Sequence, residues 1–161
     1  PRGEIGIVEW KGPNIFKGYW CMPEKTKAEF RDDGFFITGD MGFVEPDGYV
    51  QLVGRSNDLI ISGGLNVYPA EVEDVLDDRP DIAESAVIGV PHPDFGEAVL
   101  AVVQATGEHF DKNGVRAELK EKLAGYKVPK DIIVMDALPR NTMGKIQKKL
   151  LREQYAEMFK R

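Results

Sequence analysis

The first third of the chain carries the apolar pattern of β-strands. Residues 3–10 and 35–53 alternate polar and apolar side chains or run apolar, and they are rich in aromatic and β-branched residues. Such runs are typical of strands, and the Pro-Asp-Gly sequence at residues 46–48 predicts a hairpin turn inside the second run. With a short helix expected over residues 23–30, the pattern predicts a β-rich segment that ends at the Gly54-Arg55 turn.

Beyond residue 54 the pattern alternates short strands with helices. Apolar residues 59–61 and 65–67 flank Gly63-Gly64, which predicts a small hairpin because glycine supplies the positive φ of such turns. A helix is expected to begin with Pro69 at its first position, where the missing N–H would be unbonded anyway. The apolar residues of this helix share one face and predict core packing; they are Val72, Val75 and Leu76.

Two strand-like runs follow at residues 84–90 and 98–104, and we expect them to pair. A second helix is predicted from Val115, Leu119 and Leu123, and a third strand from residues 132–134. The last helix is predicted from an apolar stripe at Ile146, Leu150, Leu151, Tyr155 and Met158. The expected fold class is α+β, with a β-rich segment at residues 1–54, a hinge at 55–58 and a small α+β domain at 59–161.

Composition narrows the function classes. The chain has 161 residues, 42% of them hydrophobic, and a net charge of −6, which suits a globular protein with its own core. Its single cysteine, Cys21, excludes an internal disulfide, and His92 and His109 are too few for a metal-ligand cluster. No apolar run approaches membrane-spanning length and no secretory signal opens the chain, so we expect no membrane partner.

Charge is distributed unevenly along the chain. Residues 55–110 carry 2 basic and 11 acidic side chains, whereas residues 111–161 carry 13 basic and 7 acidic ones. The basic end could attract the phosphates of ATP, CoA or a nucleic acid. Nucleic acid is disfavoured, because the whole chain is acidic and carries no helix-turn-helix, zinc-finger or aromatic RNA-binding signature. The basic residues concerned are Lys127, Lys130, Arg140, Lys145, Lys148 and Lys149; for Lys148 and Lys149 a solvated helix face is the alternative.

The sharpest candidate for chemistry is Lys145, which follows a tight polar turn and is expected to open the last helix. Pro139 fixes φ, Asn141 and Thr142 can supply turn hydrogen bonds, and Gly144 allows a close backbone approach to a ligand. An ammonium held outward on such a loop can reach a phosphate or carboxylate oxygen as charge develops there. A nucleoside-triphosphate P-loop is excluded by spacing, since the required glycine and the Ser or Thr after the lysine are missing. A solvated lysine at a helix start remains the alternative.

Asp40 and Arg55 form a second candidate site. Thr38-Gly39-Asp40 and Gly54-Arg55 each lie where an apolar strand is expected to meet a polar loop. A carboxylate after a strand can accept both hydroxyls of a ribose, and an arginine in a glycine turn can bind ribose or phosphate oxygens. Taken singly, each motif is better explained as a turn aspartate or a surface arginine, and only together with the Lys145 loop do they favour a binding site.

In this order the motifs resemble the C-terminal part of the adenylate-forming enzymes, the superfamily of acyl- and aryl-CoA synthetases. The resemblance covers essentially the whole chain, from residues 3–6 (Gly-Glu-Ile-Gly) through 63–73 (Gly-Gly-Leu-Asn-Val-Tyr-Pro-Ala-Glu-Val-Glu) to the Lys145 motif. Residues 90–97 and 138–145 are most similar to the malonyl-CoA synthetases within it. The chain begins at Pro1 and lacks the upstream Gly/Ser/Thr phosphate loop of such ligases, so we expect a fragment that is inactive alone.

The resemblance implies an acid–thiol ligase, an AMP-forming acyl-CoA synthetase, and it also implies a cytoplasmic location. In that family a carboxylate attacks the α-phosphate of Mg-ATP to give an acyl-adenylate and pyrophosphate, and CoA then displaces AMP. Residues 1–54 would be the last β-rich segment of the large AMP-binding domain and residues 59–161 its mobile C-terminal domain. ATP, CoA and a small carboxylic acid, malonate first, are the implied ligands, with the Mg²⁺ ligands in the missing N-terminal portion.

Residue roles are carried over by matching position. Lys145 would be catalytic and would contact carboxylate and phosphate oxygens, while Asp40 and Arg55 would bind the ribose and phosphate of ATP or AMP. Gly63, Gly64 and Leu65 would leave room for the pantetheine arm of CoA, although an ordinary hairpin turn explains them equally well.

Asn57 would be the hinge between the two half-reactions. The family usually has Asp or Lys there, and asparagine keeps the conformational tolerance while removing the charge. The spacing from Pro139 to Gly144-Lys145 also resembles the pattern that bacterial lysine acetyltransferases modify, which makes Lys145 an expected acetylation site and a deacetylase an expected partner.

Other functions stay open at this point. The acid could be an aryl or another acyl substrate, and the acceptor could be a carrier protein loaded by an adenylation domain. In a different class, the chain could be a non-enzymatic interaction module whose Lys145 is recognised by a lysine acetyltransferase.

Overall fold

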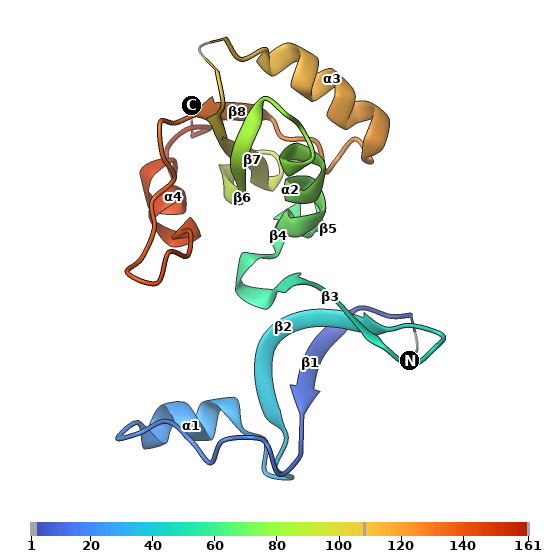
Figure 1. Ribbon diagram of the computed structural model, residues 1–161, viewed down its shortest axis with the longest axis vertical. Coiled ribbons are helices and arrows are strands. Elements are labelled where there is room, and N and C mark those ends of the chain that lie inside the picture. The colour runs from blue at the N-terminus through green and yellow to red at the C-terminus, as the bar shows by residue number, and fades with distance from the viewer. Residues whose placement is uncertain (1–2, 108, 161) are drawn as a thin grey trace. The chain divides into compact units, whose positions relative to one another are not determined.

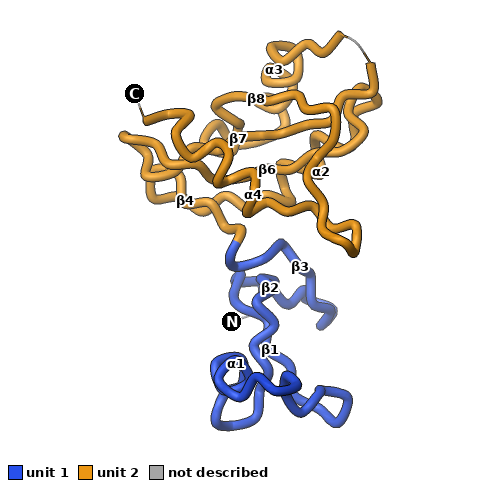
Figure 2. Tube along the Cα trace, turned by 90° about the vertical axis from the view of Figure 1, so that its left-hand side faces the viewer, with its two compact units in different colours: residues 1–57 blue, residues 58–161 orange. Residues whose placement is uncertain are grey.

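The computed structural model describes residues 3–107 and 109–160. It divides into two compact units, residues 1–57 and 58–161 (Figure 2). This boundary falls inside the segment 55–58 that the sequence suggests as a hinge, and each unit is described by itself below.

Unit 1 is a three-stranded antiparallel sheet with one helix. Its strands β1 (Gly6–Trp10), β2 (Phe36–Val44) and β3 (Val50–Arg55) lie in the order β1-β2-β3, and helix α1 spans Pro23–Glu29. The predicted turn joins β2 to β3, with Gly48 at φ +94° and the Asp47 carboxylate accepting a hydrogen bond from the Tyr49 N–H at 3.1 Å. Side-chain acceptance of this kind is what favours Asp in tight turns.

A partly exposed aromatic cluster lies at the helical end of unit 1. Phe16 stacks edge-on against Tyr19, Phe30 and Phe36, with ring centroids 5.0–5.5 Å apart. Edge-to-face contacts of this length are favourable beyond the area they bury. They join α1 and its flanking loops to the start of β2, the strand that carries Asp40.

Unit 2 is built on a mixed sheet. Strands β4 (Ile60–Ser62), β5 (Leu65–Val67), β6 (Ile82–His92) and β7 (Gly96–Ala105) lie in the order β5-β4-β7-β6, and β8 (Asp131–Val134) pairs in parallel with β7. The predicted pairing of β6 with β7 is confirmed, and it is antiparallel over almost the full length of both strands. The helices are α2 (Pro69–Asp77), α3 (Lys112–Lys122) and α4 (Lys148–Gln154).

Helices cover both faces of the β6–β7 pair (Figure 1). Alternate residues of β7 point to opposite faces: Val99 and Ala101 pack with α2 and α3, and Leu100 and Val102 pack with the α4 side. Because both faces of these strands are covered, successive residues are all buried, and both strands therefore read as continuous apolar runs. The α2–α3 side also buries Val72, Leu76, Val115 and Leu119, as their helical spacing predicts. The α+β class is thereby confirmed.

The C-terminal helix differs from its prediction. It covers only Lys148–Gln154. Ile146 precedes it, and Tyr155 and Met158 lie in turns after it. All three still pack against the buried apolar cluster around Leu151, called here the α4-side cluster. Leu150 is 43% exposed and does not belong to the apolar face. Apolar spacing therefore identified the side chains that reach this cluster, but it overestimated the length of the helix.

Candidate functional site

Residues 139–147, called here the lysine loop, form a tight hairpin. Arg140 and Ile146 pair as an antiparallel bridge, and the Asn141 N–H donates to the Lys145 carbonyl at 2.9 Å. The Asn141 side chain accepts from the backbone N–H groups of Met143 at 3.0 Å and Lys145 at 2.9 Å. Gly144 has φ +79°, a left-handed conformation that favours glycine. The loop is thus fixed by its own backbone and by one asparagine.

Lys145 projects from this hairpin and is exposed. Among the residues that the structure describes, its ammonium takes part in no ion pair or side-chain hydrogen bond. Two expectations are corrected. Lys145 does not open the last helix, which begins at Lys148, and Thr142 makes no side-chain hydrogen bond within the described residues, because Asn141 already satisfies the turn.

The basic residues near the C-terminus do not form one free patch. Lys127 binds Glu71 at 2.5 Å, and that hydrogen bond raises the pKa of Lys127 despite its partial burial. Lys148 binds Glu73 at 2.6 Å, and both side chains are mostly buried. A solvated face therefore holds for Lys149, whose side chain is 83% exposed, but not for Lys148.

Asp40 and Arg55 are brought together in unit 1. They are paired residues of β2 and β3, and the Arg55 Nε lies 3.3 Å from the Asp40 Oδ1 with both side chains partly exposed. The Thr38 hydroxyl donates to the Val8 carbonyl at 2.7 Å and accepts from the Asp40 N–H at 3.0 Å, which fixes the backbone beneath the carboxylate. Asp40 lies within β2, so the expectation that it follows the end of a strand is wrong, whereas Arg55 is the last residue of β3 and directly precedes the turn at residues 56–58. The strand pairing itself supplies their proximity.

Asn57 lies in a single 3-10 turn, η1 (Ser56–Asp58), between two anchored neighbours. The Ser56 hydroxyl donates to the Gly39 carbonyl of unit 1 at 3.1 Å. Asp58 binds Arg152 of α4 in unit 2 at 2.9 Å. The turn is therefore held to a different unit on each side of Asn57, whose own side chain makes no hydrogen bond within the described residues.

Gly63 and Gly64 form the two-residue turn between β4 and β5. Their φ values of +59° and +79° are those of a type I′ hairpin. Leu65, the next residue, is 49% exposed. The Gly63 N–H donates to the Phe95 carbonyl at 2.9 Å, and a Cβ at Gly63 would lie 3.6 Å from the Phe95 ring.

Phe95 and Lys130 border this turn, and the sequence analysis did not single them out as a pair. The Lys130 ammonium lies 4.4 Å from the Phe95 ring centroid, a distance at which a cation is attracted to the ring face. These residues are far apart in the chain, so no spacing signal connects them. The glycine turn is consequently flanked by an aromatic face and a positive charge.

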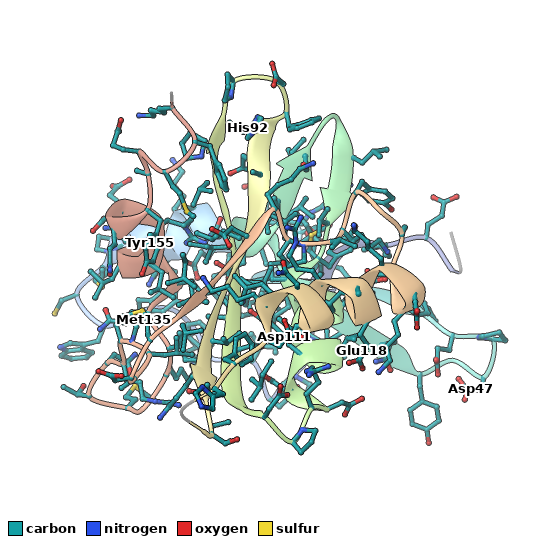
Figure 3. All side chains as sticks on the ribbon, turned by 90° about the horizontal axis from the view of Figure 1, so that it is seen from above. Asp47, His92, Asp111, Glu118, Met135 and Tyr155 are labelled. Atoms are coloured by element: carbon teal, nitrogen blue, oxygen red, sulfur yellow. The ribbon has the colours of Figure 1, made fainter. Side chains whose placement is uncertain are left out.

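The lysine loop and the glycine turn lie at opposite ends of β6. Arg140 of the lysine loop contacts Glu84 near the start of that strand. The glycine turn contacts Phe95, beyond the His92 end, and Figure 3 shows His92 at the β6–β7 turn. A strand rises ~3.3 Å per residue, so Glu84 and His92 are roughly 26 Å apart. Unit 2 therefore carries two separate candidate surfaces.

Two features are absent from the described part of the chain. No group of three or more His, Cys, Asp or Glu residues is placed to hold a metal ion. No described helix is both long and apolar enough to cross a membrane.

Comparison with known proteins gives consistent matches. Residues 71–145 match the model of the AMP-binding enzyme C-terminal domain family. The chain is 48% identical over 156 residues to a feruloyl-CoA synthase from Amycolatopsis, covering 96% of this chain and 32% of that protein. The chain thus spans about a third of the length of the curated relatives it matches.

Solved structures match this chain over nearly its whole length. The ATP-bound structure of MatB from Rhodopseudomonas palustris, a malonyl-CoA synthetase, is 58% identical with a TM-score of 0.90, covering 99% of this chain and 32% of that one. MenE from Bacillus subtilis, an o-succinylbenzoate-CoA synthetase solved with its acyl-adenylate intermediate, is 37% identical with a TM-score of 0.87, covering 96% and 31%. Residues 71–145 match the family model, and the relatives and solved structures extend the match over nearly the whole chain, so this chain belongs to the AMP-binding adenylate-forming enzymes and carries their C-terminal domain.

Proposed function

We propose that the chain is the C-terminal part of an ATP-dependent acid–CoA ligase that works through an acyl-adenylate. The observation that carries this proposal is Lys145, an exposed lysine without an ion-pair partner among the described residues, held on a rigid hairpin within a domain of the AMP-binding family. A cation held in this way can stabilise negative charge without reorganising during the reaction.

In the first half-reaction, a carboxylate oxygen attacks the α-phosphorus of ATP and pyrophosphate leaves. The Lys145 ammonium would contact the attacking carboxylate and the phosphate oxygens, where charge builds up. The Asp40 carboxylate would accept hydrogen bonds from the ribose hydroxyls, and Arg55, 3.3 Å from Asp40, would orient that carboxylate and reach a ribose or phosphate oxygen.

In the second half-reaction, the CoA thiolate attacks the acyl carbonyl and AMP leaves. The turn at Gly63, Gly64 and Leu65 would face the site, because two residues without side chains allow the pantetheine arm to pass close to the backbone. Phe95 and Lys130 beside that turn offer an aromatic face and a charge for the rest of CoA.

The lysine loop and the glycine turn lie at opposite ends of β6, so they can serve one active site only if unit 2 turns between the half-reactions. Asn57 would be the hinge, because its neighbours Ser56 and Asp58 are bound to different units. Hinges are usually a few residues between well-anchored elements. Residues 1–54 would then belong to the large domain and residues 59–161 to the mobile one.

ATP and CoA are the proposed co-substrates. The Mg²⁺ that accompanies ATP would be held by residues outside this chain, which spans about a third of the length of its ligase relatives. The isolated chain should accordingly be inactive.

Malonate is the first candidate for the acid, supported by the 58% identity to MatB. An aryl acid is the second candidate, supported by the 48% identity to a feruloyl-CoA synthase. ATP–pyrophosphate exchange by the full-length enzyme across malonate, ferulate, o-succinylbenzoate and a long-chain fatty acid tests the proposal. Exchange with one acid, followed by CoA thioester formation, supports it; exchange with none rejects it, and transfer to a carrier protein in place of CoA corrects the acceptor.

Acetylation of Lys145 is a further part of this proposal. Lys145 is exposed and unpaired within the described residues, whereas Lys148 is engaged by Glu73. Acetylation would remove the charge and stop adenylation. Mass spectrometry after incubation with acetyl-CoA and a lysine acetyltransferase should find the modification on Lys145, with activity lost and then restored by a deacetylase. Modification confined to Lys149, with activity intact, would reject it.

A further inference from the structure

We propose that two ion pairs, Lys148–Glu73 and Arg140–Glu84, clamp the lysine loop at both of its ends and make Lys148 and Arg140 positioning residues for Lys145. The inference rests on the proposed function, because it concerns the adenylation step. It assigns roles to two basic residues that would otherwise be counted as part of a general positive surface.

The entry end of the loop is held by Arg140. The preceding residue, Leu138, is 5% exposed within the α4-side cluster, so the chain enters the loop from a fixed point. The Arg140 guanidinium then contacts the Glu84 carboxylate of β6 and the Gly144 carbonyl. One side chain thus connects the sheet to the residue immediately before Lys145.

The exit end of the loop is held by Lys148. Its ammonium lies 2.6 Å from the Glu73 Oε1, and the two side chains are only 19% and 17% exposed. The same Glu73 oxygen accepts the Val87 N–H of β6 at 2.6 Å. Glu73 therefore joins α2, β6 and the start of α4, and removing Lys148 would leave a mostly buried carboxylate without its cation, which is far more disruptive than loss of a surface pair.

These contacts matter because Lys145 has no fixed partner of its own within the described residues. Its position is set by the loop backbone, whose Asn141 hydrogen bonds keep the hairpin closed but do not attach it to the sheet. The loop is attached to the rest of unit 2 by the ion pairs at its two ends, together with Ile146, which packs against the cluster that contains Leu151. A reacting group displaced by about 1 Å can lose about two orders of magnitude in rate, so a loop released at one end should slow adenylation while the glycine turn, at the other end of β6, is unaffected.

Lys149 is the matched control. It is adjacent to Lys148 in the same helix and carries the same charge, but its side chain is 83% exposed and its ion pair with Glu153 spans 3.8 Å. Exposed helix pairs of this kind contribute little. Substitution of Lys149 removes the same charge from the same helix without releasing the loop.

The test measures both half-reactions in the full-length enzyme. Lys148→Ala should lower ATP–pyrophosphate exchange by about 10- to 100-fold, the scale of a small misplacement, with thioester formation from supplied acyl-adenylate changed less than about threefold. Lys148→Arg should restore most of the exchange, and Lys149→Ala should match the wild type. In a Lys145→Ala background, Lys148→Ala should cost almost nothing more, because residues that act as one unit are non-additive.

The outcomes separate this inference from the proposed function. If the wild type exchanges and Lys145→Ala does not, but Lys148→Ala keeps full exchange or slows both half-reactions equally, the clamp is refuted and the proposed function stands. If Lys145→Ala exchanges normally, the proposed function itself fails. A melting curve will show whether Lys148→Ala folds. If it does not, Arg140→Gln, at the more exposed end of the loop, is compared with the wild type in the same two half-reactions. An unchanged exchange rate in Arg140→Gln refutes the clamp.

Discussion

Replacing Gly64 tests whether the glycine turn serves the thioester step. Its φ of +79° is unfavourable for alanine, but a Cβ there would meet nothing within 4 Å. Gly64→Ala should therefore cost only the left-handed backbone strain, about 1–2 kcal/mol. A domain stability of about 5–15 kcal/mol tolerates this loss, and the melting temperature should fall by about 4–8 °C per kcal/mol.

The rate should change more than the stability. If the pantetheine arm passes over this turn, a side chain on Gly64 displaces it, and a shift of about 1 Å costs about two orders of magnitude. Thioester formation from supplied acyl-adenylate should then fall by about 10- to 100-fold, while ATP–pyrophosphate exchange stays within about twofold of the wild type.

Gly64→Asn separates steric blocking from strain. Asparagine adopts positive φ more readily than alanine, so its stability cost is smaller although its side chain is larger. If blocking is the cause, thioester formation should be at least as slow in Gly64→Asn as in Gly64→Ala. If thioester formation is instead faster in Gly64→Asn, the more stable variant, or if both half-reactions lose rate equally, the role assigned to the turn is refuted.

Two further predictions concern the hinge and a structural ion pair. Asn57→Pro should slow one half-reaction and spare the other, because proline fixes φ in a range that 3-10 turns already use and so locks η1; unchanged rates for both would place the hinge elsewhere. The Arg79 hydrogen bond holds the pKa of Asp81 below its ordinary value, so its contribution to stability is complete above the unfolded-state value of about 3.9 and is lost as the pH falls through the folded value. Asp81→Asn should therefore lower the melting temperature at pH 7, and its difference from the wild type should shrink as the pH falls through the folded-state pKa of Asp81; a difference that does not depend on pH would contradict this assignment.

Local signals in the sequence accounted for most of unit 2. Pro69 does begin α2, two glycines do make the β4–β5 turn, and the runs at 84–90 and 98–104 do pair. Each of these features is set by neighbouring residues or by a period of two or 3.6. They were predictable because local geometry and burial act together there.

The remaining features depend on contacts between distant residues. The stripe ending at Met158 predicted a long helix, but a helix and a series of turns can bring the same apolar residues to one cluster. The partners of Arg140 and Lys148, namely Glu84 and Glu73, lie far away in the chain. No spacing rule predicts such pairs, so the sequence identified Lys145 but not the contacts around its loop.

The central claim is that the two ends of β6 serve different half-reactions of one enzyme. It is tested most directly by measuring both half-reactions of the full-length enzyme with Lys145→Ala. Lys145 is exposed and unpaired within the described residues, so the variant should fold normally, with adenylation slowed by about two to three orders of magnitude. Thioester formation from supplied acyl-adenylate should remain within a few fold of the wild type. Equal loss in both half-reactions, or undiminished adenylation, would contradict the account.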